Sequence, residues 1–172
     1  AAYAAKDEGS ARQAINHLYK ASKMAQTDGD DVVMTEHVET AHEVLKRNHV
    51  MEGIRGLTPQ NKYVLTAVTL LEVRDETPAR TGEVYPVYRD IAESVGSEPL
   101  VQRRMRDHLQ ELDLHSQISL KTQTGGIQGG TYYTAELKTD LDATISVLAE
   151  LDDSMAEIAS DIRGIAEKTG ML

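Results

Sequence analysis

The sequence predicts a mainly helical protein that carries one small β-hairpin. Apolar residues recur three and four positions apart over most of the chain, which is the spacing of one helical face. Near residue 117 the pattern changes to alternation of polar and apolar residues, and this alternation returns at residue 131. Alternation is typical of half-buried strands, and the glycine-rich segment 124–130 between them predicts the turn of a hairpin.

Residues 1–53 form the first predicted helical unit. Its first helix covers residues 4–26, with one apolar face made by Ala11, Ala14, Ile15, Leu18, Ala21 and Ala25. After a turn, Thr35 is expected to cap a second helix. Two such helices bury too little surface for a stable domain, so we expect them to be the end of a larger helical domain. The first residue, Ala1 rather than Met, also suggests a fragment of a longer protein.

A second domain is expected over residues 57–149. Gly53 and Gly56 mark a link before it, and Thr58 and Pro59 have the types typical of a helix cap and of the first helical position. The elements expected before the hairpin are a helix over 59–75, an extended segment over 79–85, a helix that Pro86 opens and Gly96 ends, and a helix that begins at 97–99 and runs to about Leu112. This order, followed by a hairpin, is that of a winged helix.

The last helix before the hairpin is the candidate DNA-recognition helix. Its core face is expected to contain Val101, Met105, Leu109 and Leu112. Its opposite face and flanks are polar, with Gln102, Arg103, Arg104, Arg106 and Gln110. A recognition helix reads base edges with its N-terminal residues, and the arginine fork suits guanine edges and phosphates. The alternative is a solvated arginine face that pairs with Asp107 and Glu111.

The hairpin tip supports the DNA interpretation. Its polar donors surround glycines and comprise Lys121, Gln123, Thr124 and Gln128. Glycine allows a backbone to approach a sugar-phosphate chain closely, as a wing in an adjacent minor groove would require. The alternative is an ordinary exposed loop.

Net charge is −10, which taken alone argues against a nucleic-acid partner. The charge is unevenly distributed, however. Residues 58–135 have a balance of −2, whereas residues 136–172 hold three basic and nine acidic side chains. Such an acidic excess with small apolar side chains is also typical of a protein from a halophile. The predicted helical segment 137–168, interrupted at Asp152, either docks on its own domain or forms a small coiled-coil seam, and residues 150–172 are treated as a C-terminal amphipathic helix.

Several function classes are disfavoured by composition. No Walker A sequence is present, so the chain itself is not expected to be an enzyme or to bind a nucleotide cofactor. There is no cysteine, and the six histidines are scattered, so neither a catalytic constellation nor a metal site is predicted. No apolar run approaches the roughly 20 residues that span a bilayer, and no secretory signal is seen; we expect a cytoplasmic protein without a membrane partner.

Three segments resemble one family. Residues 4–15 resemble the sensor-2 region of AAA+ replication initiators, whose usual form is Gly-Asp-Ala-Arg-x-Ala. Residues 82–88 are similar to the family signature that enters the second winged-helix helix, and residues 103–112 to its recognition helix. The family is that of the archaeal origin-recognition and cell-division-control initiators, and the resemblance extends to about residue 149.

The resemblance implies a longer protein with an N-terminal AAA+ ATPase core that binds ATP or ADP with Mg²⁺. Residues 1–53 are then the end of the AAA+ lid, and Arg12 matches the sensor-2 arginine, which in the family reaches the γ-phosphate. Ser10 stands where the family usually has Asp. The implied partners are double-stranded origin DNA, the replicative helicase, whose recruitment ATP binding would control, and other initiator subunits.

Two other functions remain open at this point. The winged helix is alternatively a protein-interaction module, with the acidic C-terminal helix as the partner surface, or part of a winged-helix transcription regulator. An ATPase core encoded upstream would separate the initiator from the regulator.

Overall fold

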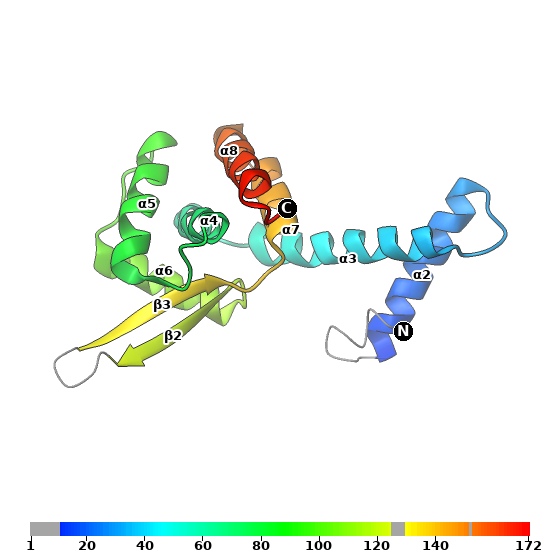
Figure 1. Ribbon diagram of the computed structural model, residues 1–172, viewed down its shortest axis with the longest axis horizontal. Coiled ribbons are helices and arrows are strands. Elements are labelled where there is room, and N and C mark those ends of the chain that lie inside the picture. Colours follow the sequence, from blue (N-terminus) through cyan, green and yellow to red (C-terminus); the bar gives the residue numbers. More distant parts are fainter. Residues whose placement is uncertain (1–10, 125–129, 152) are drawn as a thin grey trace. The chain divides into compact units, whose positions relative to one another are not determined.

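The computed structural model describes residues 11–124, 130–151 and 153–172, with side chains from residue 14 onward. The chain divides into two compact units, one up to His49 and one from Val50. In order along the chain the elements are α2 (Ala11–Asp28), α3 (Thr35–Arg55), α4 (Pro59–Val73), β1 (Ala79–Arg80), α5 (Thr81–Ser94), α6 (Gln102–Leu114), β2 (Ile118–Thr124), β3 (Thr131–Leu137), α7 (Leu141–Leu151) and α8 (Asp153–Thr169) (Figure 1).

The first unit contains α2 and most of α3. Its buried side chains include Ala21, Ala25 and Ala41, which are at most 3% exposed, and His37, which is 8% exposed. The expectation that Ile15 and Leu18 belong to the buried face is wrong, because they are 66% and 61% exposed. The buried apolar side chains of this unit are therefore alanines.

The second unit is built around α4. This helix contacts α5, α6, α7, α8 and β3, so it is buried on nearly every side, as expected for a helix that is apolar all round. Its predicted cap is confirmed: the Asn61 N–H donates to Thr58 Oγ1 at 3.3 Å, and Pro59 occupies the first helical position. The cap fixes where the central helix of the domain begins.

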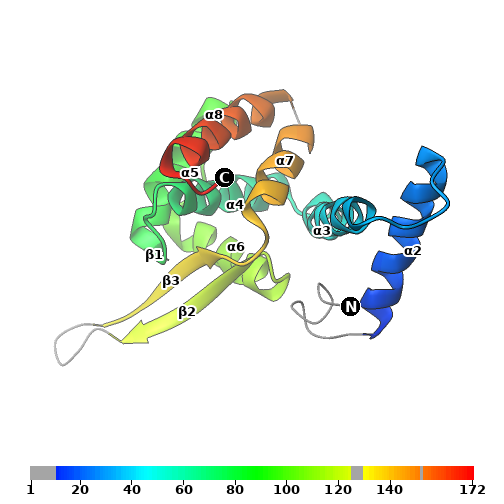
Figure 2. The same cartoon turned by 45° about the vertical axis from the view of Figure 1, so that its right-hand side comes forward.

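The predicted hairpin is confirmed and belongs to a three-stranded antiparallel sheet with the order β1-β3-β2. Ile118 pairs with Leu137 and Thr124 with Thr131, so both strands are longer than the alternating segments of the sequence. Ile118 and Ala135 are buried toward the core. Figure 2 shows the hairpin extending away from the helices of the second unit.

The helix α5 begins earlier than expected. Pro86 lies inside it, and the first residue is Thr81. The reason is a cap that the sequence pattern did not reveal: the Arg80 N–H donates to Glu83 Oε2 at 2.6 Å. Inside a helix, proline removes one backbone hydrogen bond and its ring crowds the carbonyl four residues earlier, so Pro86 does not mark the start of α5 but is tolerated within its second turn.

The helix α6 begins later than expected, at Gln102 rather than near Pro99. The Leu100 N–H donates to the Tyr88 hydroxyl at 2.8 Å, which holds the preceding turn in a non-helical path. Val101 is therefore the N-cap and is 66% exposed, so its predicted place in the core is wrong.

The predicted link at Gly53 is also wrong, because α3 continues through it to Arg55. The side chain of Gln117 lies against Gly53 so closely that a Cβ at this position would overlap its amide. The small size of the glycine leaves room for the Gln117 amide at this position, and no turn is formed there.

The C-terminal helices follow the docked alternative. Asp152, the predicted interruption, lies outside the described residues; α7 ends at Leu151 and α8 begins at Asp153. The helix α8 packs against α7 and α4, and its buried face is Met155, Ala159, Ile162 and Ala166. Among the described helices, none is long and apolar enough to cross a membrane.

Candidate nucleic-acid interface

The helix α6 presents its arginines away from the core. Met105, Leu109 and Leu112 are fully buried, as predicted. The side chains of Gln102, Arg103, Arg104 and Gln110 are exposed, and that of Arg106 is half-buried. The amphipathic spacing of this helix therefore produces a polar outer face.

Two of the three arginines are available for a ligand. Arg104 lies 3.7 Å from Asp107, an exposed pair of the kind that contributes little to stability. Within the described part of the chain, Arg103 and Arg106 have no ion pair or hydrogen bond. The alternative in which the arginine face is satisfied by Asp107 and Glu111 thus applies to Arg104 alone.

Buried polar contacts hold α6 against the rest of the domain. His108 Nδ1 lies 2.5 Å from Asn61 Oδ1 on α4. The Tyr88 hydroxyl donates to Gln60 Oε1 at 2.5 Å and accepts the Leu100 N–H, which fixes the turn before α6. The start of the arginine-bearing helix is therefore set by contacts with both α4 and α5.

The predicted wing residues lie on β2 and near its end. Lys121, Gln123 and Thr124 are exposed, and Gln128 lies outside the described residues. Lys121 Nζ donates to Glu136 Oε1 on β3, and this bond lowers the pKa of the Glu136 carboxyl below its ordinary value. Lys121 therefore forms an ion pair with Glu136, whereas the described structure shows no acidic partner for Gln123 or Thr124.

A groove of about 500 Å³ lies between the starts of α5 and α6 and the strand β3. Its polar lining includes Arg80, Gln102, Arg103, Arg106, Tyr132 and Tyr133. Sequence reasoning identified three of these and missed Arg80 and the two tyrosines. The guanidinium carbon of Arg80 lies 4.5 Å from the centre of the Tyr132 ring, within cation–π range.

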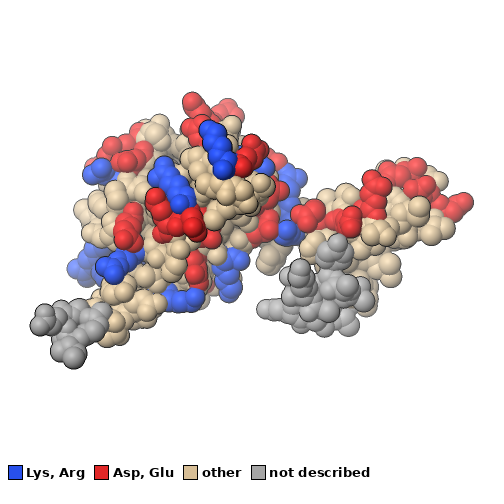
Figure 3. Space-filling view, viewed as in Figure 1, with Lys and Arg blue, Asp and Glu red and all other residues tan. Residues whose placement is uncertain are grey.

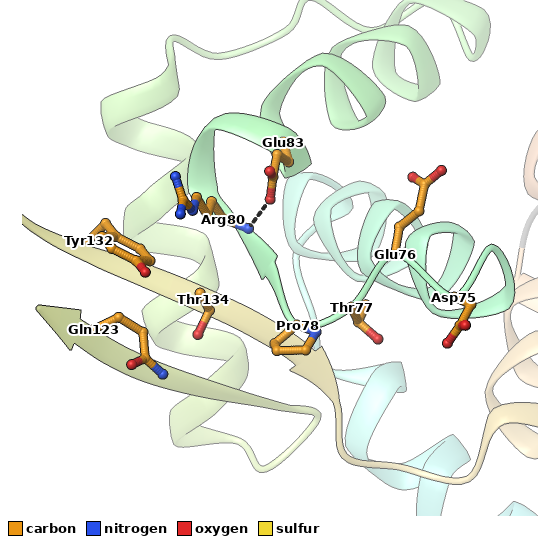
Figure 4. A pocket seen from close by; sticks show the side chains of 9 residues that line it. All are labelled: Asp75, Glu76, Thr77, Pro78, Arg80, Glu83, Gln123, Tyr132 and Thr134. Carbon is orange, nitrogen blue, oxygen red and sulfur yellow. Dashed lines mark hydrogen bonds between the residues drawn. The ribbon is translucent and has the colours of Figure 1, made fainter. Parts of the chain in front are cut away.

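A second hollow lies on the other side of this Arg80–Tyr132 pair. Figure 4 shows Asp75 and Glu76 at one end of it and Gln123 and Tyr132 at the other. The carboxylates make this hollow unfavourable for an anion, whereas the groove toward α6 is lined by arginines. In Figure 3, several Lys and Arg side chains lie near the hairpin, with Asp and Glu side chains among and above them.

The remaining predicted site residue is Arg12, in the first unit. Arg12 belongs to α2, but its side chain and the whole of Ser10 lie outside the described residues, so the sensor-2 role stays a prediction. No group of three or more potential metal ligands occurs in the described ranges.

The fold and the arginine-bearing helix beside a hairpin define a winged-helix protein with a preceding helical unit. Residues 52–147 match the family model of the CDC6 C-terminal winged helix domain, and residues 1–43 match that of the Cdc6 AAA+ ATPase-type lid domain. The chain belongs to the Orc1/Cdc6 family of DNA replication proteins.

Relatives of known name support this assignment. The chain is 39% identical over 90% of its length to ORC1-type DNA replication protein 11 of Haloarcula marismortui, and 41% identical over 76% to the ORC1-type protein of Pyrococcus horikoshii. It spans only 37% and 31% of those proteins. The solved structure of Aeropyrum pernix ORC1 in complex with DNA matches 91% of this chain and 40% of that one, with 30% identity and a TM-score of 0.75.

Proposed function

We propose that the chain is the C-terminal part of a replication initiator and binds duplex origin DNA through its winged helix. The helix α6 would enter the major groove with Gln102, Arg103, Arg104, Arg106 and Gln110, and the wing would lie beside it with Lys121, Gln123, Thr124 and Gln128. The observation that carries the proposal is the presence of two arginines without a partner in the described structure, at the start of one exposed helix.

Arg103 is exposed and Arg106 is half-buried, so their guanidinium donors are accessible to a ligand, and phosphates and guanine edges match the arginine fork. The relative from Aeropyrum pernix was solved with DNA bound, which supports the same class of ligand for this chain.

We further propose that an AAA+ core elsewhere in the longer protein binds ATP or ADP with Mg²⁺, that Arg12 contacts the nucleotide there, and that nucleotide binding controls helicase recruitment.

The test is a fluorescence titration of labelled origin-repeat duplex and of a shuffled duplex of equal length. Replacing Arg103 and Arg106 together by alanine is expected to weaken binding to the origin duplex at least about tenfold, because each removes a charge-assisted contact. The slope of log affinity against log salt should become shallower by about two, since roughly 0.9 counterion is released per phosphate contact.

The matched control is Arg89→Ala with Lys168→Ala. This control also removes two positive charges, one from α5 and one from the last turn of α8. On α5, the Arg89 guanidinium already lies 3.2 Å from the Asp90 carboxylate. This control should keep the origin affinity within about twofold, because neither residue lines the groove and exposed charges away from the DNA are screened by salt. Equal losses in the two double variants would contradict a specific interface on α6.

A further inference from the structure

The strand register brings Arg80 and Tyr132 together on the outer face of the sheet. Arg80 pairs with Thr134 across β1 and β3, and Tyr132 lies two residues before Thr134 on β3. Side chains two apart on a strand share a face, so Arg80 reaches Tyr132 diagonally. The observed 4.5 Å between the guanidinium carbon and the ring centre is the result.

The backbone and side chain of Arg80 are fixed by different partners. Its N–H donates to Glu83 Oε2 as the cap of α5, and its side chain rests on the Tyr132 ring. Arg80 is exposed and has no ion pair among the described residues. The guanidinium is therefore held in place while its hydrogen-bond donors stay free.

The groove next to this pair contains three guanidinium groups, those of Arg80, Arg103 and Arg106. Among the described residues that line it, Glu83 is the only carboxylate, and its Oε2 accepts the Arg80 N–H. Thr81 also lines the groove, but its hydroxyl is buried, without a hydrogen-bond partner in the described structure. Three guanidinium groups outnumber this single carboxylate, so the groove favours an anion such as a phosphate.

We propose that Arg80, held by Tyr132, binds a backbone phosphate of the DNA strand that passes between the start of α6 and the wing. This inference rests on the proposed function and adds a contact on β1 and α5 to those on α6 and the hairpin. Because Arg80 would meet phosphate rather than a base edge, its contribution is independent of DNA sequence and fixes the position of the duplex.

The experiment uses the 172-residue chain with the origin-repeat duplex and the shuffled duplex. Arg80→Ala is expected to weaken binding to the two duplexes several-fold and to the same extent. It should also make the slope of log affinity against log salt shallower by about one. Arg89→Ala is the charge-matched control on α5 and should change neither quantity. Arg80→Gln, which keeps the length of the side chain, should behave like Arg80→Ala; circular dichroism verifies that both variants are folded.

A double-mutant cycle tests the role of Tyr132. Tyr132→Leu should weaken DNA binding by the parent chain. The same change should have a much smaller effect in the Arg80→Ala variant, because the role of the Tyr132 ring is to hold the Arg80 guanidinium. Tyr132→Phe keeps the aromatic face and should bind like the parent chain. Independent effects of the two changes would contradict the proposed coupling.

The outcomes separate this inference from the proposed function. Unchanged affinity and salt slope in Arg80→Ala, together with a loss in the Arg103 and Arg106 double variant, would overturn the role of Arg80 and leave the winged-helix interface intact. Absence of duplex binding by the parent chain would overturn both. Saturable binding of inorganic phosphate at millimolar concentration, followed by NMR of the arginine Nε–H groups, together with unchanged duplex affinity in Arg80→Ala, would identify a free-anion site and contradict the assignment to DNA.

Discussion

Tyr88 links three elements through a single hydroxyl group. The side chain is fully buried, donates to Gln60 on α4 and accepts the N–H of Leu100 in the turn before α6. Burial raises the pKa of the Tyr88 phenol above its ordinary value, so the group stays neutral and keeps its proton for Gln60. The position of the first residue of α6 therefore depends on this one side chain.

Replacing Tyr88 by phenylalanine is expected to lower the free energy of unfolding by about 1–3 kcal/mol, because the Leu100 N–H and the Gln60 carbonyl lose their partner inside the protein. Urea denaturation measures the change. Tyr85→Phe is the matched control on the same helix. Because Tyr85 is only half-buried, this change should lower the free energy of unfolding by less than about 0.5 kcal/mol, as surface changes usually do. Equal costs for the two variants would refute the role given to the Tyr88 hydroxyl.

The residues of the α6 face could be predicted from the sequence because helical periodicity alone determines which side chains share a face. Val101 was misplaced because that periodicity says nothing of where the helix begins, and a hydrogen bond from a distant tyrosine decides it. Arg80 and Tyr132 were missed because they are some 50 positions apart and meet only through the pairing of β1 with β3. The residues around β1 and β3 do not by themselves show that these two strands pair, or in which register.

At the scale of elements, α8 completes the core of the second unit. Its face of Met155, Ala159, Ile162 and Ala166 is at most 3% exposed and contacts α4 and α7. The sequence left open whether this segment docks or pairs with another chain, because apolar spacing is the same in both cases. The element order of the domain, in contrast, followed from the change of period and from glycine and proline positions.

Replacing Ile162 by alanine should lower the free energy of unfolding by about 2–4 kcal/mol, since a buried aliphatic side chain leaves a cavity. Ile158→Ala, one turn earlier and half-buried, should cost about half as much or less. Thermal unfolding at several protein concentrations measures both. A loss of stability that grows on dilution would instead indicate a seam between chains and contradict docking on the same domain.

At the scale of the whole molecule, the acidic excess is spread unevenly along the chain. The net charge is −10, yet residues 58–135 contribute only −2 and hold the exposed arginines, whereas residues 136–172 contribute −6. If the proposed function holds, such an acidic chain should repel DNA over its acidic regions and favour approach through the arginine groove. We therefore expect the uneven charge to orient the duplex before close contacts form.

The most direct test of the DNA-binding face is a map of backbone amide shifts in the isotope-labelled chain as origin-repeat duplex is added. We predict that the shifts concentrate at residues 80–83, 102–110 and 131–133, and that the exposed face of α8 stays unchanged. Shifts confined to α7 and α8, with none at the start of α6, would contradict the account.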